Sequence, residues 1–175
     1  MVGVPGSGKS TQSQLLSATG KYRWIYIGEV LRRTVTGEDA ELMRSGKLLD
    51  DNKVISYLEQ EIARVGAGPE IIIDGFPRSV YQTDWLVGSH KSQAYTIRAV
   101  IHIQVDKEVV LERLVNRGRP DDTEEAIAAR FKIYETAIHP IIRDLETHKV
   151  PIITVDGSQE ALDVFADISK ELSRL

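Results

Sequence analysis

Short runs of apolar residues alternate along the chain with stretches in which apolar positions recur every three or four residues. The apolar runs are rich in β-branched residues and predict strands at 24–27, 70–73, 97–105 and 150–155. The periodic stretches predict helices at 11–17, 50–65, 107–115, 122–146 and 158–172. Runs that are apolar at every position are typical of strands buried on both faces, as in a parallel sheet. The alternation therefore predicts an α/β fold in three layers, an open parallel sheet with helices on both faces.

The composition narrows the class of protein. The 175 residues carry a net charge of −4, with 42% hydrophobic and 27% charged positions, which is typical of one globular domain. The mild acidity argues against nucleic acid as a partner, since that usually needs a basic excess. The absence of cysteine excludes disulfides, thiolate zinc sites and cysteine nucleophiles. No membrane span or secretory signal is evident, so we expect a cytoplasmic protein without a membrane partner.

The segment GVPGSGKS at 3–10 matches the pattern G-x-x-x-x-G-K-[ST] without a mismatch. Its glycines let backbone N–H groups turn inward and form a nest for phosphate, capped by the following helix. There Lys9 supplies a charge to the β- and γ-phosphates, and the Ser10 hydroxyl can bind Mg²⁺. The alternative is a glycine-rich turn before an ordinary helix, which is disfavoured because the helical pattern begins directly after the motif.

A strand should lead into this loop, yet only Met1 and Val2 precede Gly3. Strands normally contain roughly three to ten residues. We therefore expect the first strand to be truncated, with several apolar residues belonging before Met1.

A second candidate site follows the apolar run at 71–73. Asp74 stands at the carboxyl end of this predicted strand, where ligands bind in open α/β sheets. It can hold Mg²⁺ there through water, or it can simply form a turn with Gly75. Arg78 lies four residues further on and is expected near the same edge, unless it is an ordinary surface arginine.

Four arginines gather around the helix predicted at 107–115. Arg113 and Arg117 are four residues apart and share a helical face, Arg119 follows closely, and Arg130 lies on the next predicted helix. Arg113 has no acidic residue three or four positions away. Arginines without local partners suggest an anionic ligand, since the guanidinium clamps phosphate at two points. The alternative is a solvated basic face.

These residues together resemble the nucleoside monophosphate kinase family over nearly the whole chain. The matching blocks, in the family's order and spacing, are 3–10, 28–32 (GEVLR), 46–49 (GKLL), 74–78 (DGFPR) with Gln82, 113–119 (RLVNRGR), 121–125 (DDTEE) with Arg130, and 155–157 (VDG). The resemblance implies a P-loop fold and reversible transfer of the γ-phosphoryl group from MgATP to AMP, giving two ADP. It also implies Mg²⁺ as the cofactor, ATP and AMP as the partners, and a monomer.

The resemblance implies a role for each matching residue. ATP would be bound by Gly3, Pro5, Gly6, Ser7, Gly8, Lys9, Ser10, Thr11, Arg113, Gly157 and Gln159. AMP would be bound by Ile27, Gly28, Arg32, Leu49, Val54, Gly75, Arg78, Gln82, Arg119 and Arg130. The catalytic side chains, which neutralise the transferred group, would be Lys9, Arg78, Arg117, Arg119 and Arg130. Mg²⁺ would be held by Ser10 and Asp74, partly through water.

Two movable parts follow from the same resemblance. Residues 28–65 would form a lobe that closes over the acceptor nucleotide and excludes water. Residues 118–122 would form a short lid, which leaves no room for a zinc cluster, so no zinc is expected. Asp122 at the end of this segment matches a capping box with Glu125, and we favour that structural role over a ligand contact.

The chain departs from the family where the acceptor base would be read. Ile27 stands where members that use AMP usually have Thr, and Glu29 replaces the common Asp. Ile27 makes no hydrogen bond, which keeps UMP or CMP as alternative acceptors, whereas the Gln82 amide can pair with an adenine edge and favours AMP. A nucleotide-binding module without turnover is a third alternative. His102 lies inside an apolar run and is expected to be a packed histidine rather than a metal ligand.

Overall fold

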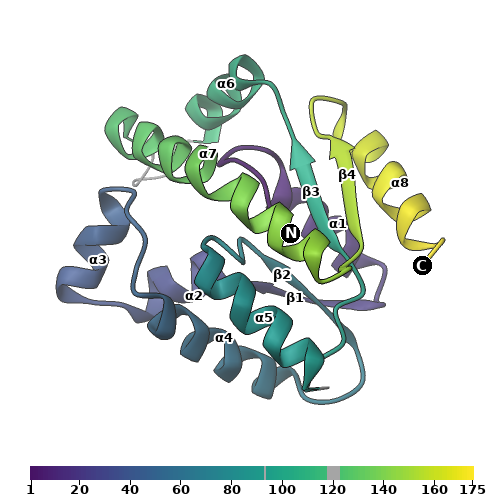
Figure 1. The fold of residues 1–175 in the computed structure, drawn as a ribbon. Coiled ribbons are helices and arrows are strands. Elements are labelled where there is room, and N and C mark those ends of the chain that lie inside the picture. Colours follow the sequence, from purple (N-terminus) through teal and green to yellow (C-terminus); the bar gives the residue numbers. More distant parts are fainter. Residues whose placement is uncertain (93, 118–122) are drawn as a thin grey trace.

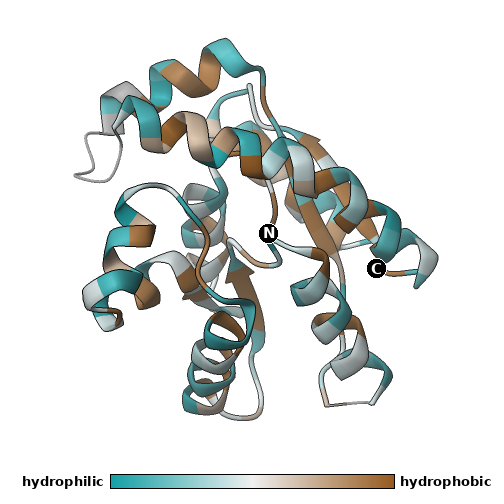
Figure 2. Cartoon of the chain, turned by 60° about the vertical axis from the view of Figure 1, so that its left-hand side comes forward, coloured by the Kyte–Doolittle hydropathy of each residue, from teal (hydrophilic) through white to brown (hydrophobic). Residues whose placement is uncertain are grey.

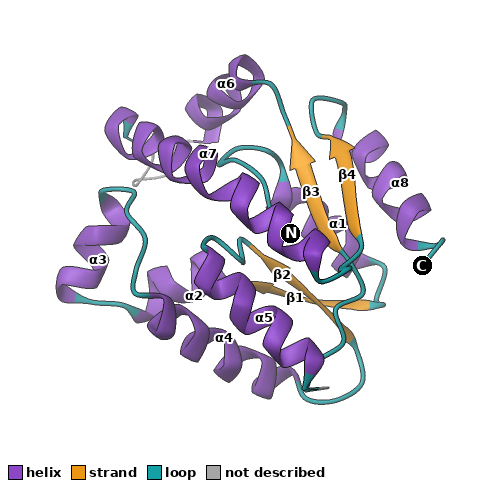
Figure 3. Ribbon diagram, viewed as in Figure 1, coloured by secondary structure: helices purple, strands orange, loops and turns teal. Residues whose placement is uncertain are grey.

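The fold is that of a computed structural model, which describes residues 1–92, 94–117 and 123–175, without the side chains of Val115 and Arg117. In this part of the chain the strands form two parallel pairs (Figure 3). One pair joins β1 (Tyr22–Tyr26) to β2 (Glu70–Asp74), and the other joins β3 (Val100–Gln104) to β4 (Ile152–Asp156). The parallel strands predicted from the apolar runs are therefore confirmed, with ends that differ by a few residues.

The first two residues lie between the two pairs. The backbone of Val2 donates to the carbonyl of Ile101 and accepts from the amide of Ile103, each at 2.9 Å. On its other side, the carbonyl of Met1 accepts from the amide of Gly75 at 3.2 Å. Residues 1–2 thus connect β2 to β3 in a parallel sense, as the start of a strand that feeds the loop at 3–8. That further apolar residues belong before Met1 stays a prediction.

Helices cover both faces of this sheet, as predicted. On one face, α1 (Lys9–Ala18) and α8 (Ala161–Leu172) pack through Leu16 and Ile168 onto Ile103. The opposite face is covered by α4 (Asp51–Val65), α5 (Val80–Lys91) and α7 (Glu124–Thr147). In Figure 1, α5 and α7 stand in front of the strands. Figure 2 shows hydrophobic residues on the strands and on the helix faces turned toward them. Both faces of the sheet are buried, which explains the uninterrupted apolar runs.

The chain between β1 and β2 is helical and packs in an apolar cluster that also includes residues of both strands and of α5. It contains α2 (Ile27–Thr34), α3 (Gly37–Arg44) and α4, with Leu31 and Leu58 packed together in that cluster. The helix α6 (Lys107–Arg117) follows β3. Among the described residues, no helix is both long and apolar enough to cross a membrane.

The cap predicted for the long helix is wrong. Helix α7 begins at Glu124, and its N-cap is Thr123, whose side-chain oxygen accepts from the amide of Ala126 at 3.2 Å. Asp122, which was expected to cap this helix with Glu125, lies outside the described residues. Two good cap formers stand side by side here, and Thr123 matches the helix start one residue later.

His102 is a packed residue of β3, as expected. It is buried, and its Nε2 lies 2.8 Å from the hydroxyl oxygen of Tyr134 on α7. Burial lowers the pKa of His102 and raises the pKa of Tyr134 to about 12. A neutral imidazole paired with a phenol is therefore part of the contact between the sheet and α7.

Candidate active site

The loop at 3–8 leads directly into α1. Gly8 precedes the helix with φ +94°, a left-handed conformation that favours glycine. The Lys9 ammonium donates to the carbonyls of Gly3 and Val4, both at 2.8 Å. The loop therefore curls around a positive charge at the N-terminus of a helix, and both features favour an anion.

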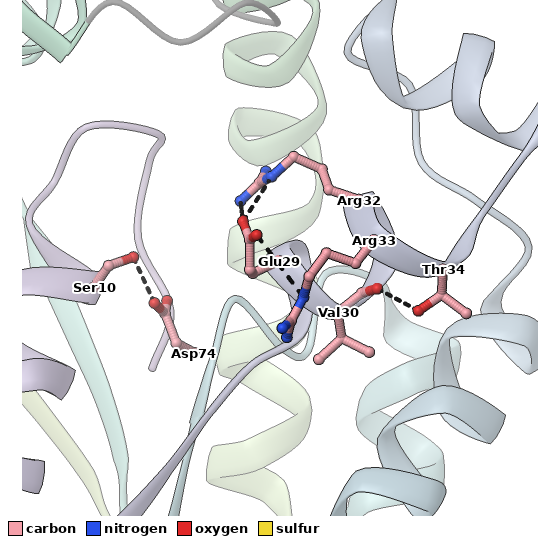
Figure 4. Close-up of polar contacts among 7 residues, drawn as sticks. All are labelled: Ser10, Glu29, Val30, Arg32, Arg33, Thr34 and Asp74. Atoms are coloured by element: carbon pink, nitrogen blue, oxygen red, sulfur yellow. Dashed lines mark hydrogen bonds and ion pairs between the residues drawn. The ribbon is translucent and has the colours of Figure 1, made fainter.

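Asp74 ends β2 beside this loop. It is 0% exposed, and its Oδ2 accepts from the Ser10 hydroxyl at 2.6 Å (Figure 4). Its other carboxylate oxygen, Oδ1, is buried and finds no hydrogen-bond partner in the described part of the chain. A buried carboxylate oxygen normally has a partner. A carboxylate and a hydroxyl are ligands that Mg²⁺ prefers, so these two residues fit the ion that accompanies a nucleoside triphosphate.

Arg78 is held in place by the turn after β2. Its Nε donates 2.7 Å to the carbonyl of Gly75, and its backbone amide donates 2.8 Å to Oε1 of Gln82. Arg78 is an exposed residue that lines the cavity, and partial desolvation of its guanidinium lowers its pKa while Tyr26 and Asp74 oppose the change. An arginine remains charged at neutral pH, so Arg78 presents a fixed positive charge.

Arg32 reaches the same region from α2. Its Nη2 lies 3.1 Å from the carboxylate of Glu29, which also lies 3.9 Å from Nε of Arg33 (Figure 4). The guanidinium carbon of Arg32 lies 5.2 Å from the ring centre of Tyr26, a cation–π distance. Tyr26 had no predicted role, and the available signal was an aromatic residue just before Ile27 and the GEVLR block at 28–32.

Arg113 on α6 and Arg130 on α7 are each bonded to backbone carbonyls of other elements. Arg113 donates from Nη1 to the carbonyl of Gly157 at 2.8 Å and from Nη2 to that of Gln159 at 3.4 Å. The sequence has no acidic residue three or four positions from Arg113, and in the fold its partners are two carbonyls of the loop after β4, far from it along the chain. Arg130 on α7 lies 3.4 Å from the carbonyl of Met43 on α3. These bonds orient both guanidinium groups from elements distant in sequence.

One cavity of about 650 Å³ unites these groups at the carboxyl ends of the strands. Of the described residues that line it, the basic ones outnumber the acidic ones, although the whole chain has a net charge of −4. The basic side chains are Lys9, Arg32, Lys47, Arg78, Arg113 and Arg130, and the acidic ones are Asp74 and Glu160. Concentrated positive charge in a cleft of this size suits a polyanionic small molecule.

The cavity contains nearly all of the residues predicted for the site. Every described residue predicted to bind ATP, AMP or Mg²⁺ lines it. Two other predicted site residues are not placed: Arg119 lies outside the described residues, and for Arg117 α6 gives the backbone position alone. Lys47 also lines the cavity and had no predicted role, although it belongs to the GKLL block.

A phosphate nest opening into a basic cavity at the carboxyl ends of parallel strands defines a P-loop nucleotide-binding protein of the α/β class. The family model described as adenylate kinase matches residues 1–150. Similar proteins include the adenylate kinases of Prochlorococcus marinus strain AS9601, 34% identical over 98% of this chain and 96% of the relative, and Mycobacteroides abscessus, 33% identical over 99% and 98%. The chain belongs to the adenylate kinase family, a family of phosphotransferases.

Proposed function

We propose that this protein transfers the γ-phosphoryl group of MgATP reversibly to AMP, giving two ADP. The observation that carries the proposal is that one cavity holds both the phosphate loop and a second group of arginines at the end of the sheet. An oxygen of the AMP phosphate attacks the γ-phosphorus of ATP. The bond from that phosphorus to the β,γ-bridging oxygen breaks, and its electron pair leaves with the departing ADP. Such a reaction needs positioning and charge neutralisation rather than a protein nucleophile.

The donor side consists of the loop at 3–10 and the residues around it. The loop amides and Lys9 would hold the β- and γ-phosphates. Arg113 has its N–H groups directed to two backbone carbonyls, which leaves its flat face for stacking on the adenine ring. Gly157 and Gln159 support this role because they supply those carbonyls.

The acceptor side consists of Arg32, Arg78 and the helical lobe at 28–65. The two arginines would bind the monophosphate, and Leu49 and Val54 would contribute apolar surface for the nucleoside. Arg78 and Arg130 would neutralise the group in transfer, together with Arg117 and with Arg119 of the short lid. The close approach of Gly46 on the lobe to Ala126 on α7 supports a lobe that closes over the acceptor.

Ser10 and Asp74 would hold the Mg²⁺ that arrives with ATP, where it neutralises phosphate charge and orients the phosphoryl group. Removing Mg²⁺ with excess EDTA is expected to abolish ADP formation, and added MgCl₂ in excess of the chelator to restore it. Rates that stay unchanged in EDTA would exclude this role for both residues.

Closure of the lobe gives a separate prediction. Gly46 has φ +77°, and a Cβ there would lie 2.5 Å from the carbonyl oxygen of Ala126. Gly46→Ala is expected to hold the lobe off α7 and to raise the KM for AMP about tenfold, about 1.4 kcal/mol of binding, because a lobe that cannot close loses contacts with the acceptor. Gly37→Ala is the matched control, since Gly37 also has a positive φ (+58°) but nothing lies near its added Cβ. An equal rise in both variants would indicate strain rather than closure.

The deciding experiment offers AMP, UMP, CMP and GMP separately with MgATP and measures ADP formation. Turnover confined to AMP is the expected result. A preference for UMP or CMP would keep the mechanism and change the acceptor, an alternative that Ile27 favours because it is buried and has no hydrogen-bonding group. ATP binding without turnover would indicate a nucleotide-binding module. A monomer, a cytoplasmic location and a site without zinc remain predictions.

A further inference from the structure

The carboxamide of Gln82 has one orientation in this structure. Gln82 is 2% exposed on α5 and lines the cavity. Its Oε1 accepts from the backbone amide of Arg78 at 2.8 Å, and its Nε2 donates to Oδ1 of Asp51 at 2.7 Å. A backbone amide can only donate and an ionised carboxylate can only accept. The flipped carboxamide would therefore place an N–H against an N–H and an oxygen against a carboxylate.

Asp51 is itself held from outside the cavity. It is the first residue of α4, and its Oδ2 accepts from the Ser79 hydroxyl at 2.9 Å. Asp51 is not among the described residues that line the cavity. The start of α4 and the start of α5 are thus joined through a carboxylate that reaches the site only by way of Gln82.

The orientation decides what Gln82 can recognise. One N–H on Nε2 and one lone pair on Oε1 remain after the two bonds above. Adenine and cytosine present an amino donor beside a ring-nitrogen acceptor, whereas guanine and uracil present a carbonyl acceptor beside an N–H donor. A carboxamide that rotates freely can serve either pattern, but one held from both sides serves a single pattern.

We propose that Asp51 is a positioning residue that determines acceptor specificity. It holds the Gln82 carboxamide in the orientation that accepts a base with an amino group beside a ring-nitrogen acceptor and rejects a base with a carbonyl beside a ring N–H. This inference rests on the proposed function, in which Gln82 faces the base of the acceptor monophosphate. It predicts that GMP and UMP are discriminated against only by the arrangement of donor and acceptor on Gln82. The side chain of Ile27 has neither a donor nor an acceptor and does not contribute to this discrimination.

The test compares AMP with inosine monophosphate, which has the same phosphate, ribose and ring size but carries a carbonyl at position 6. The measured quantity is the ratio of kcat/KM for AMP to that for inosine monophosphate, which does not depend on the fraction of active protein. Asp51→Ala is expected to lower this ratio about tenfold, because it removes a hydrogen bond to a charged group. Asp51→Asn is expected to restore most of the ratio, since its carbonyl oxygen can accept the same bond.

Asp50→Ala is the matched control. Asp50 precedes Asp51 and caps α4 through the amide of Lys53, so its loss weakens the same helix end without touching Gln82. An unchanged ratio in Asp51→Ala, or an equal fall in Asp50→Ala, would overturn the proposal. Should Asp51→Ala fail to fold, Ser79→Ala, which frees the Asp51 carboxylate, should lower the ratio in the same direction, and an unchanged ratio there would overturn it as well.

The outcomes also separate this proposal from the proposed function. Wild-type protein that makes no ADP from AMP would reject the function itself. Turnover with AMP, together with a Gln82→Ala variant that keeps the wild-type ratio, would leave the function standing and overturn the role of Asp51, since the residue it positions would not read the base.

Discussion

Replacement of Lys9 by methionine is expected to lower the turnover number with MgATP and AMP by roughly a hundredfold to a thousandfold. The ammonium lies at the centre of the phosphate loop, 2.8 Å from two loop carbonyls, where it would neutralise charge on the β- and γ-phosphates. Losing one preorganised electrostatic group in such a site typically costs this much. The measurement is the initial rate of ADP formation at saturating concentrations of both nucleotides.

Lys21→Met is the matched control, because Lys21 is exposed just before β1 and does not line the cavity. It should retain the wild-type rate. Thermal unfolding of both variants shows how much the lost loop contacts of Lys9 matter to the fold. A Lys9→Met variant with a near-normal rate would remove the phosphate loop from the mechanism.

Arg78→Ala is expected to have the second largest effect, and to act on the acceptor. Its guanidinium is fixed beside Asp74 by the carbonyl of Gly75, so it is preorganised for a monophosphate. A hydrogen bond to a charged group contributes about 1.5–3 kcal/mol, which predicts a fall of roughly tenfold to a hundredfold in kcat/KM for AMP. The KM for ATP should change much less. Steady-state kinetics with each nucleotide varied in turn measures both.

The control for this change is Arg98→Ala. Arg98 forms an exposed ion pair with Glu70, 2.6 Å apart, outside the cavity, and exposed pairs contribute little. Its kinetics should match the wild type for both nucleotides. If Arg78→Ala raised the KM for ATP more than the KM for AMP, the donor and acceptor sides proposed above would have to be exchanged.

Local pattern was sufficient for much of the fold. Strands β2, β3 and β4 were predictable from uninterrupted apolar runs, since helices cover both faces of the sheet.

The ends of helices were less predictable where two residues compete for one role. Helix α8 starts at Ala161 instead of 158, because the amide of Ser158 donates to the Asp156 carboxylate and residues 157–158 form a turn. Thr123, and not Asp122, is the N-cap of α7, because its hydroxyl oxygen accepts from the amide of Ala126.

The site shows the same division. The phosphate loop is contiguous in sequence, so its spacing alone predicts an anion nest, and Asp74 is predictable from its place after a buried strand. The partners of Arg113, Arg32 and Gln82 were not predictable, because Gly157, Tyr26 and Asp51 belong to other elements or to positions without a motif. Contacts across elements depend on how the elements pack.

By itself, the sequence determined the α/β class, the phosphate loop with Lys9 and Ser10, and the kinase family of the chain, because each rests on spacing within short segments. Only the tertiary structure decided which groups meet. It placed the carbonyls after β4 against Arg113 and the start of α4 against Gln82. The physical reason is that a side chain's partner, and hence its orientation, depends on groups brought within about 3 Å by folding, whatever their separation along the chain.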